Sequence, residues 1–175
     1  PHNDIVYFII ADVAGKGVHD GMVMAKVSTL FEVMSREQVD PDEMMFHMNN
    51  DLFITKTSGM FVACVLGKYD LISDEISWVN GGHQPALIRN QQGNYQNFDS
   101  EAPPMGVISQ KDKSIYKINK KVLNGDKFIV FTDGLSESLD EEGEEIGIDG
   151  SIKIIEDNYT KDSKNHLSYI TKKLI

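Results

Sequence analysis

Two apolar runs in this sequence lead to the same feature, an aspartate followed by a turn of small residues. The run Ile5–Ile10 leads to Asp12, and the run Lys127–Phe131 leads to Asp133. β-Branched and aromatic residues dominate both runs, so each is predicted to be a buried strand that ends at its aspartate. A carboxylate beside a buried strand is costly to desolvate unless it is paired or binds a metal ion.

Two such carboxylates on neighbouring strands would repel each other, and a divalent cation would relieve the repulsion. Carboxylate and carbonyl oxygens with water form a hard site that suits Mg²⁺ or Mn²⁺ and not zinc. The spacing alone leaves a second interpretation open, in which Asp12 and Asp133 are turn or helix-cap residues. A nucleotide-binding P-loop is excluded, because Ile10 stands where the first glycine is needed and Gly17 follows the lysine.

The periodicity of the chain favours an α+β fold. Apolar residues recur at helical spacing from Val18 to Met34, and a cap residue, a proline and two acids indicate a second helix from Asp40 to about Phe53. Shorter periods typical of strands follow at Met60–Leu66, Ile76–Asn80, Ala86–Arg89 and Tyr116–Asn119. Because the helices form a block and the strands outnumber them, we expect antiparallel sheet with helices packed outside.

The composition excludes several classes of function. Against 17 basic residues stand 27 acidic ones, which gives a net charge of -10, and such a surface repels nucleic acids and anionic membranes. No apolar run reaches the ~18–20 residues that span a bilayer, and no signal-peptide pattern opens the chain. The single Cys64 excludes an internal disulfide and is expected in the core, so we expect a cytoplasmic protein.

Several motifs then occur in a fixed order. They are Asp12-Val13-Ala14-Gly15-Lys16-Gly17, Met60-Phe61-Val62, Trp78-Val79-Asn80-Gly81-Gly82-His83-Gln84-Pro85, Pro104-Met105-Gly106-Val107 and Phe131-Thr132-Asp133-Gly134-Leu135-Ser136-Glu137. This order resembles the SpoIIE/RsbU-type bacterial branch of the PP2C-like (PPM) serine/threonine phosphatases. That family has Asp-Val-Ser-Gly-Lys-Gly, Met-Phe-Val, Tyr-Val-Asn-Ala-Gly-His-x-Pro, Pro-Leu-Gly-Val and Tyr-Thr-Asp-Gly-x-x-Glu, so Ala14 replaces the usual serine.

The resemblance implies an α-β-β-α sandwich of antiparallel sheets with outer helices, and one SpoIIE-type domain over residues 1–175. It implies two Mn²⁺ or Mg²⁺ ions held by Asp12, by the backbone carbonyl of Val13 and by Asp133. The metal-bound water would hydrolyse phosphoserine or phosphothreonine on a regulatory partner protein. Lys16 and His83 are expected on the substrate side, although a solvated lysine and a loop-stabilising histidine are the plainer interpretations.

Relatives carry further metal-binding aspartates, in Gly-Gly-Asp-x-x-Asp upstream and Asp-Asp-x-Thr downstream, that this sequence lacks. Both ends also lie inside patterned segments, so we expect a domain truncated at both ends, poorly active alone. By resemblance the parent chain carries a sensory or receiver domain, and the phosphorylated partner is of the type that antagonises an anti-sigma factor. The alternative is a catalytically inactive module of the same fold that binds a partner.

Overall fold

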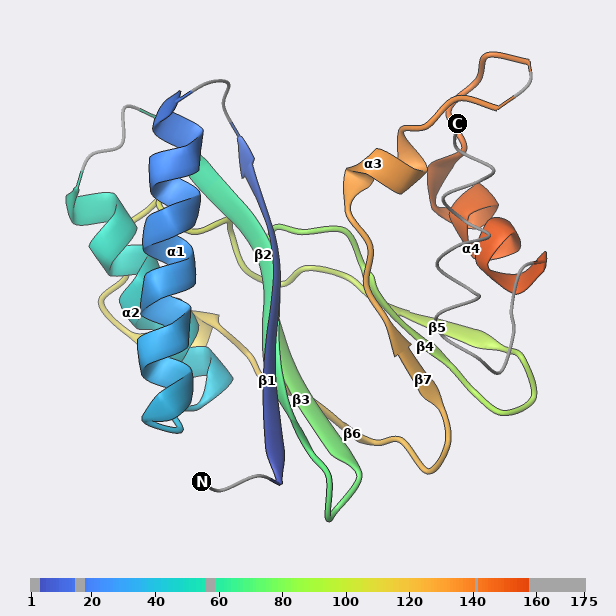
Figure 1. Ribbon diagram of the computed structural model, residues 1–175, viewed down its shortest axis with the longest axis horizontal. Helices are drawn as coiled ribbons and strands as arrows, with labels where there is room; N and C mark the ends of the chain where they lie inside the picture. The colour runs from blue at the N-terminus through green and yellow to red at the C-terminus, as the bar shows by residue number, and fades with distance from the viewer. Residues whose placement is uncertain (1–3, 15–17, 56–58, 141, 158–175) are drawn as a thin grey trace. The chain divides into compact units, whose positions relative to one another are not determined.

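The computed structural model describes residues 4–14, 18–55, 59–140 and 142–157 of the chain (Figure 1). It consists of two compact units, Pro1–Val130 and Phe131–Ile175, which we describe separately. None of the helices in these described segments is long and apolar enough to cross a membrane.

The first unit contains two antiparallel sheets and two long helices. One sheet has the order β1-β2-β3-β6, with strands Ile5–Ala14, Phe61–Asp70, Glu75–Gly81 and Asn119–Val122. The other has the order β5-β4-β7, with strands Tyr95–Phe98, Ala86–Arg89 and Lys127–Ile129. The helices are α1 (Val18–Arg36) and α2 (Pro41–Ile54), and a short 3-10 turn covers Lys113–Ile115. The predicted α+β class with antiparallel sheets is confirmed.

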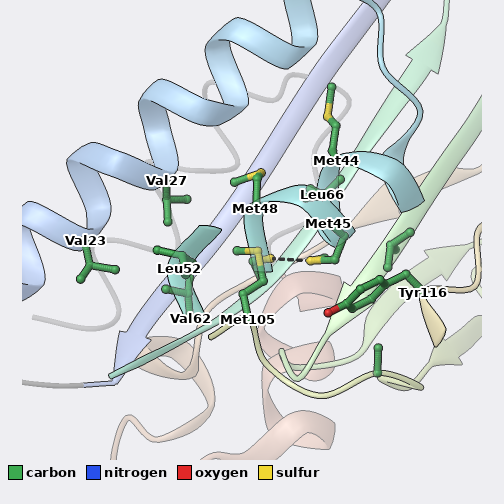
Figure 2. Packing of buried hydrophobic residues seen from close by; sticks show 13 residues of the cluster. Val23, Val27, Met44, Met45, Met48, Leu52, Val62, Leu66, Met105 and Tyr116 are labelled. Atoms are coloured by element: carbon green, nitrogen blue, oxygen red, sulfur yellow. Dashed lines mark hydrogen bonds between the residues drawn. The ribbon is translucent and has the colours of Figure 1, made fainter. Parts of the chain in front are cut away.

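Both helices cover one face of the four-stranded sheet. Val23 and Val27 of α1 are buried, and Leu30, Phe31 and Met34 pack beside them at helical spacing, as predicted. From α2, Met44, Met45, Met48 and Leu52 join the same buried cluster (Figure 2). These methionines are core residues. Cys64 joins the same cluster and is fully buried.

A second apolar cluster lies between the two sheets. Val65, Ile76 and Trp78 come from the four-stranded sheet, and Ala86 and Ile88 come from the three-stranded sheet. Aromatic rings join the faces, with centroid distances of 4.9 Å for Trp78–Phe128 and 5.5 Å for Phe8–Phe128. The first unit is therefore layered as helices, sheet and sheet.

Several strand predictions were wrong at their boundaries. The strand predicted at Lys127–Phe131 is shorter, because β7 covers only Lys127–Ile129, and it is partly exposed instead of buried. The first strand continues through Asp12 to Ala14, because β1 pairs with β2 along its whole length, and it is a half-buried edge strand instead of a buried one. The predicted strand at Tyr116–Asn119 begins only at Asn119. Tyr116 instead closes the 3-10 turn, where its N–H donates to the Lys113 carbonyl at 2.9 Å and its ring is buried in the helix-side core.

The second unit contains α3 (Asp133–Ser136) and α4 (Gly147–Asp157) with an acidic loop between them. The Asp140 carboxylate accepts hydrogen bonds from the N–H groups of Glu142 at 3.0 Å and Glu144 at 2.9 Å, which folds this loop on itself. Because α4 belongs to the separate unit, the outer helical layer over the three-stranded sheet stays a prediction.

Gly67 is required where three groups converge in the sheet. A Cβ there would lie 2.4 Å from the Ser77 carbonyl oxygen, 2.6 Å from the Phe8 ring and 2.9 Å from Trp78 Cβ. We expect Gly67→Ala to lower the free energy of unfolding by about 1–3 kcal/mol. Gly21→Ala is the control, because nothing lies within 4 Å of its added Cβ, and it should stabilise α1 by about 0.5–1 kcal/mol. Equal effects of the two changes in urea unfolding would contradict this packing.

Burial raises the pKa of the Cys64 thiol from 9.0 to about 12. The native thiol should therefore resist a thiol-specific reagent at neutral pH, and react only on unfolding. Above pH 9.0 the unfolded thiol ionises while the folded one stays protonated, so this group makes stability fall as pH rises toward 12. Cys64→Ala should reduce the alkaline slope of unfolding free energy. Rapid labelling of the native protein would show that the thiol is accessible.

Candidate metal-binding site

Asp12 lies on the face of β1 that is directed toward the second sheet. Phe8 and Ile10 pack in the cluster between the sheets, whereas Ala11 and Val13 pack toward the helices. Because side chains alternate along a strand, Asp12 lies on the same face as Phe8 and Ile10. Asp12 is exposed, and its carboxylate makes no ion pair or hydrogen bond with any residue that the structure describes. The inter-sheet face thus ends in an unpartnered carboxylate.

The backbone carbonyl of Val13 points away from the sheet. Its partner in the register is Val62, whose N–H donates to the Met105 carbonyl at 2.9 Å and whose carbonyl accepts from the Met105 N–H at 2.8 Å. Both backbone groups of Val62 therefore face away from β1, so Val13 and Val62 form a non-hydrogen-bonded pair. Since β1 is the last strand of its sheet, the Val13 carbonyl lies on the outer edge.

Two asparagines of α2 hold the loop that carries Met105. Asn49 accepts from the Gly106 N–H at 2.9 Å and donates to the Ile108 carbonyl at 3.0 Å. Asn50 accepts from the Gln110 N–H at 2.8 Å and donates to the Gln110 carbonyl at 3.0 Å. Sequence reasoning missed both asparagines, because their partners are backbone groups far along the chain.

The loop Gly81–Pro85 adjoins the same end of the sheet. Asn80 pairs with Val65, and Val65 pairs with Ile10, so Asn80 lies on the same face of the sheet as Asp12, two strands away. His83 in this loop is 8% exposed, its N–H donates to Asn80 Oδ1 at 2.9 Å, and its Nδ1 lies 3.3 Å from the Gln84 carbonyl. These contacts suit the loop-stabilising interpretation, and a contact with substrate stays a prediction.

Ser100 and Pro104 complete this loop; Pro104 belongs to a motif noted in the sequence, whereas sequence reasoning missed Ser100. The Gly82 N–H donates to Ser100 Oγ at 2.6 Å, and that oxygen lies 2.8 Å from the Ala102 carbonyl. Gly82 has φ +73°, and a Cβ there would lie 2.3 Å from the Pro104 ring. The glycine pair of the motif would have indicated the turn, but no local signal identifies the serine.

Asp133 begins α3 in the second unit. It is half-buried, and its carboxylate has no hydrogen-bond or ion-pair partner within the described ranges. In the first unit β7 ends at Ile129, which pairs with Leu87 just after the Gly81–Pro85 loop, and the chain then continues toward Asp133. Because the two aspartates belong to separately described units, their meeting at shared metals stays a prediction. Lys16 lies outside the described residues.

The donors around Asp12 fit a hard divalent cation. A carboxylate without a partner and an outward backbone carbonyl on the next residue are the oxygen ligands that Mg²⁺ and Mn²⁺ accept. Within the described parts of the chain no group of three or more His, Cys, Asp or Glu side chains could hold a metal. Asp12 and Val13 alone are thus too few to hold an ion, and their place in a larger ligand set stays a prediction.

Comparisons with known proteins agree with this fold. The family model described as "Stage II sporulation protein E (SpoIIE)" matches residues 2–175. "Phosphoserine phosphatase RsbU" of Bacillus subtilis (strain 168) is 22% identical over 134 residues, which cover 77% of this chain and 40% of RsbU. The chain thus spans less than half the length of that relative.

Two solved structures share the fold. The PP2C phosphatase domain of SpoIIE from Bacillus subtilis, with a fragment of its regulatory domain, gives a TM-score of 0.72 at 16% identity and covers 98% of this chain and 53% of that one. RsbX in complex with magnesium gives 0.70 at 15% identity and covers 99% and 76%.

Two effects disfavour a side chain at Gly82: its positive φ and the contact with the Pro104 ring. Substitutions at two glycines can separate them. Gly59 also has positive φ, at +81°, but nothing lies within 4 Å of an added Cβ there. We expect Gly59→Ala to cost about 1–2 kcal/mol from the backbone alone, and Gly82→Ala to cost a further ~1–3 kcal/mol from the Pro104 ring. Urea unfolding measures both changes, and equal losses would mean that the loop moves off Pro104 freely.

Proposed function

The chain belongs to the SpoIIE family, and on that premise we propose that it is the catalytic domain of a metal-dependent protein phosphatase. The observation that carries the proposal is the unpartnered Asp12 carboxylate beside the outward carbonyl of Val13, at the end of the inter-sheet face. This is the part of the chain that matches the family's Asp-Val-Ser-Gly-Lys-Gly motif.

Asp12 and Val13 would hold two Mn²⁺ or Mg²⁺ ions together with Asp133. Such ions, when bound, lower the pKa of a bound water and neutralise the phosphoryl oxygens during in-line attack. Among the protein's own residues, Asp12 would fix the position of the bound pair, and Lys16 and His83 would lie on the substrate side.

Covalent catalysis by the thiol is not part of this proposal. Cys64 is the only cysteine, it is fully buried, and its pKa is raised to about 12 by burial. A protonated thiol inside the core is a poor nucleophile. Direct attack by water on the phosphate ester is therefore the mechanism that these residues support.

The substrate class we propose is phosphoserine or phosphothreonine on a regulatory partner protein. RsbU, which shares the family, is named a phosphoserine phosphatase, and RsbX, which shares the fold, was solved in complex with magnesium. We further propose a cytoplasmic location, a partner of the anti-sigma-factor antagonist type, and a sensory or receiver domain in the full-length protein. The acidic surface, with a net charge of -10, argues against nucleic acid as a partner.

The experiment measures hydrolysis of a phosphoserine peptide by the full-length protein with Mn²⁺. Asp12→Asn keeps the shape of the side chain but removes its charge, so we expect activity to fall by more than about 100-fold. Chelator should abolish the activity, and added Mn²⁺ should restore it.

Asp149→Asn is the matched control, because Asp149 is an exposed aspartate of α4 in the second unit. It should retain full activity. Activity that survives both Asp12→Asn and chelator would overturn the metal mechanism. A well-folded full-length protein with no activity at any metal concentration would instead support the catalytically inactive, partner-binding alternative.

A further inference from the structure

Asn80 is a buried residue whose side-chain amide forms hydrogen bonds through both its nitrogen and its oxygen. It is 3% exposed, its Nδ2 donates to the Gln84 carbonyl at 3.0 Å, and its Oδ1 accepts from the His83 N–H at 2.9 Å. A buried asparagine satisfied in this way is costly to replace, because each lost partner leaves a desolvated polar group. The side chain therefore fixes the backbone of the Gly81–Pro85 loop at two points.

The Gln84 carbonyl also lies 3.3 Å from His83 Nδ1. A carbonyl oxygen only accepts hydrogen bonds, so Nδ1 must carry the proton in this contact. In the neutral imidazole the lone pair then belongs to Nε2. Asn80 holds the Gln84 carbonyl that selects this tautomer, because its amide donates to the same oxygen.

The loop stands close to the candidate metal site within the first unit. Asp12 pairs with Ala63, the residue before Cys64, and Cys64 pairs with Gly81. One strand, β2, lies between Asp12 and the start of the loop. The two are therefore separated by two strand spacings, or roughly 10 Å. Asn80 and Asp12 also share the inter-sheet face.

We propose that Asn80 is a positioning residue that holds the His83 loop and fixes the His83 ring with its proton on Nδ1 and its acceptor nitrogen at Nε2. Backbone carbonyls fix the tautomer of metal-binding histidines through the same kind of hydrogen bond. The catalytic consequence of this arrangement rests on the proposed phosphatase function, whereas the tautomer does not.

Ser100 gives the loop a second attachment. Its Oγ accepts from the Gly82 N–H at 2.6 Å and lies 3.1 Å from the Asn80 carbonyl. This attachment uses the backbone of Asn80 and not its side chain. Asn80→Ala should therefore leave the loop connected and the protein folded, while Ser100→Ala should loosen the loop without removing the donor to Gln84.

The first test reads the tautomer by ¹⁵N NMR of the histidine rings in the full-length protein without metal. Loss of one signal in His83→Gln assigns the ring. We expect the wild-type ring to be protonated at Nδ1 with Nε2 unprotonated, and Asn80→Ala to give a mixture of both tautomers. Ser100→Ala should keep the wild-type tautomer. A wild-type ring protonated at Nε2, or a tautomer unchanged in Asn80→Ala, overturns the proposal.

The second test compares kcat and KM for the phosphoserine peptide. We expect Asn80→Ala to lower kcat about tenfold or more with KM within about twofold, and Ser100→Ala to have the smaller effect on kcat. Equal losses in the two variants would mean that Asn80 acts only on the stability of the loop, which contradicts its positioning role. If the wild type has no phosphatase activity, the proposed function fails, and the NMR result still decides whether Asn80 sets the tautomer.

Discussion

The pairing of β1 with β2 is the constraint on which the rest of the site depends. It runs for ten residues, from Ile5 opposite Asp70 to Ala14 opposite Phe61. A slip of one residue would exchange the two faces of β1 and turn Asp12 toward the helices. Apolar clusters on both sides of the sheet prevent that slip, because Ile9 and Ala11 pack against the helix side and Phe8 and Ile10 pack between the sheets. The position of the carboxylate is thus a consequence of packing.

A short series of contacts extends this constraint to the second oxygen donor. Asn49 and Asn50 of α2 hold the loop after Met105. The backbone of Met105 is hydrogen-bonded to both the N–H and the carbonyl of Val62. That bridge shows that the backbone groups of Val62 point away from β1, so Val13 and Val62 form a non-hydrogen-bonded pair. The α2 asparagines therefore hold the loop next to this part of the sheet, although no residue of α2 belongs to the proposed ligand set.

Periodicity and motif order were enough to predict the two long helices and most of the strands, and they place Asp12 near the end of its strand. They failed where tertiary contacts override local pattern. The edge pairing carries β1 past Asp12, and the helix-side core takes Tyr116 out of its predicted strand. Ser100 could not be recognised as a loop anchor, because a serine gives no sign in sequence of which distant carbonyl it will meet. Asn80 stands in one of the sequence motifs, but its local contacts with His83 and Gln84 were not predicted. The meeting of Asp12 with Asp133 stays a prediction, because the two residues belong to separately described units.

The Asp12 carboxylate and the Val13 carbonyl are the two proposed metal ligands on which the proposed function depends. A crystal structure of the full-length protein with Mn²⁺, with the ions located by anomalous scattering, tests them most directly. We predict an ion within about 2.0–2.3 Å of both oxygens, with the Asp133 carboxylate in the same cluster. Mn²⁺ bound only elsewhere on the protein, with Asp12 left solvated, would contradict this assignment.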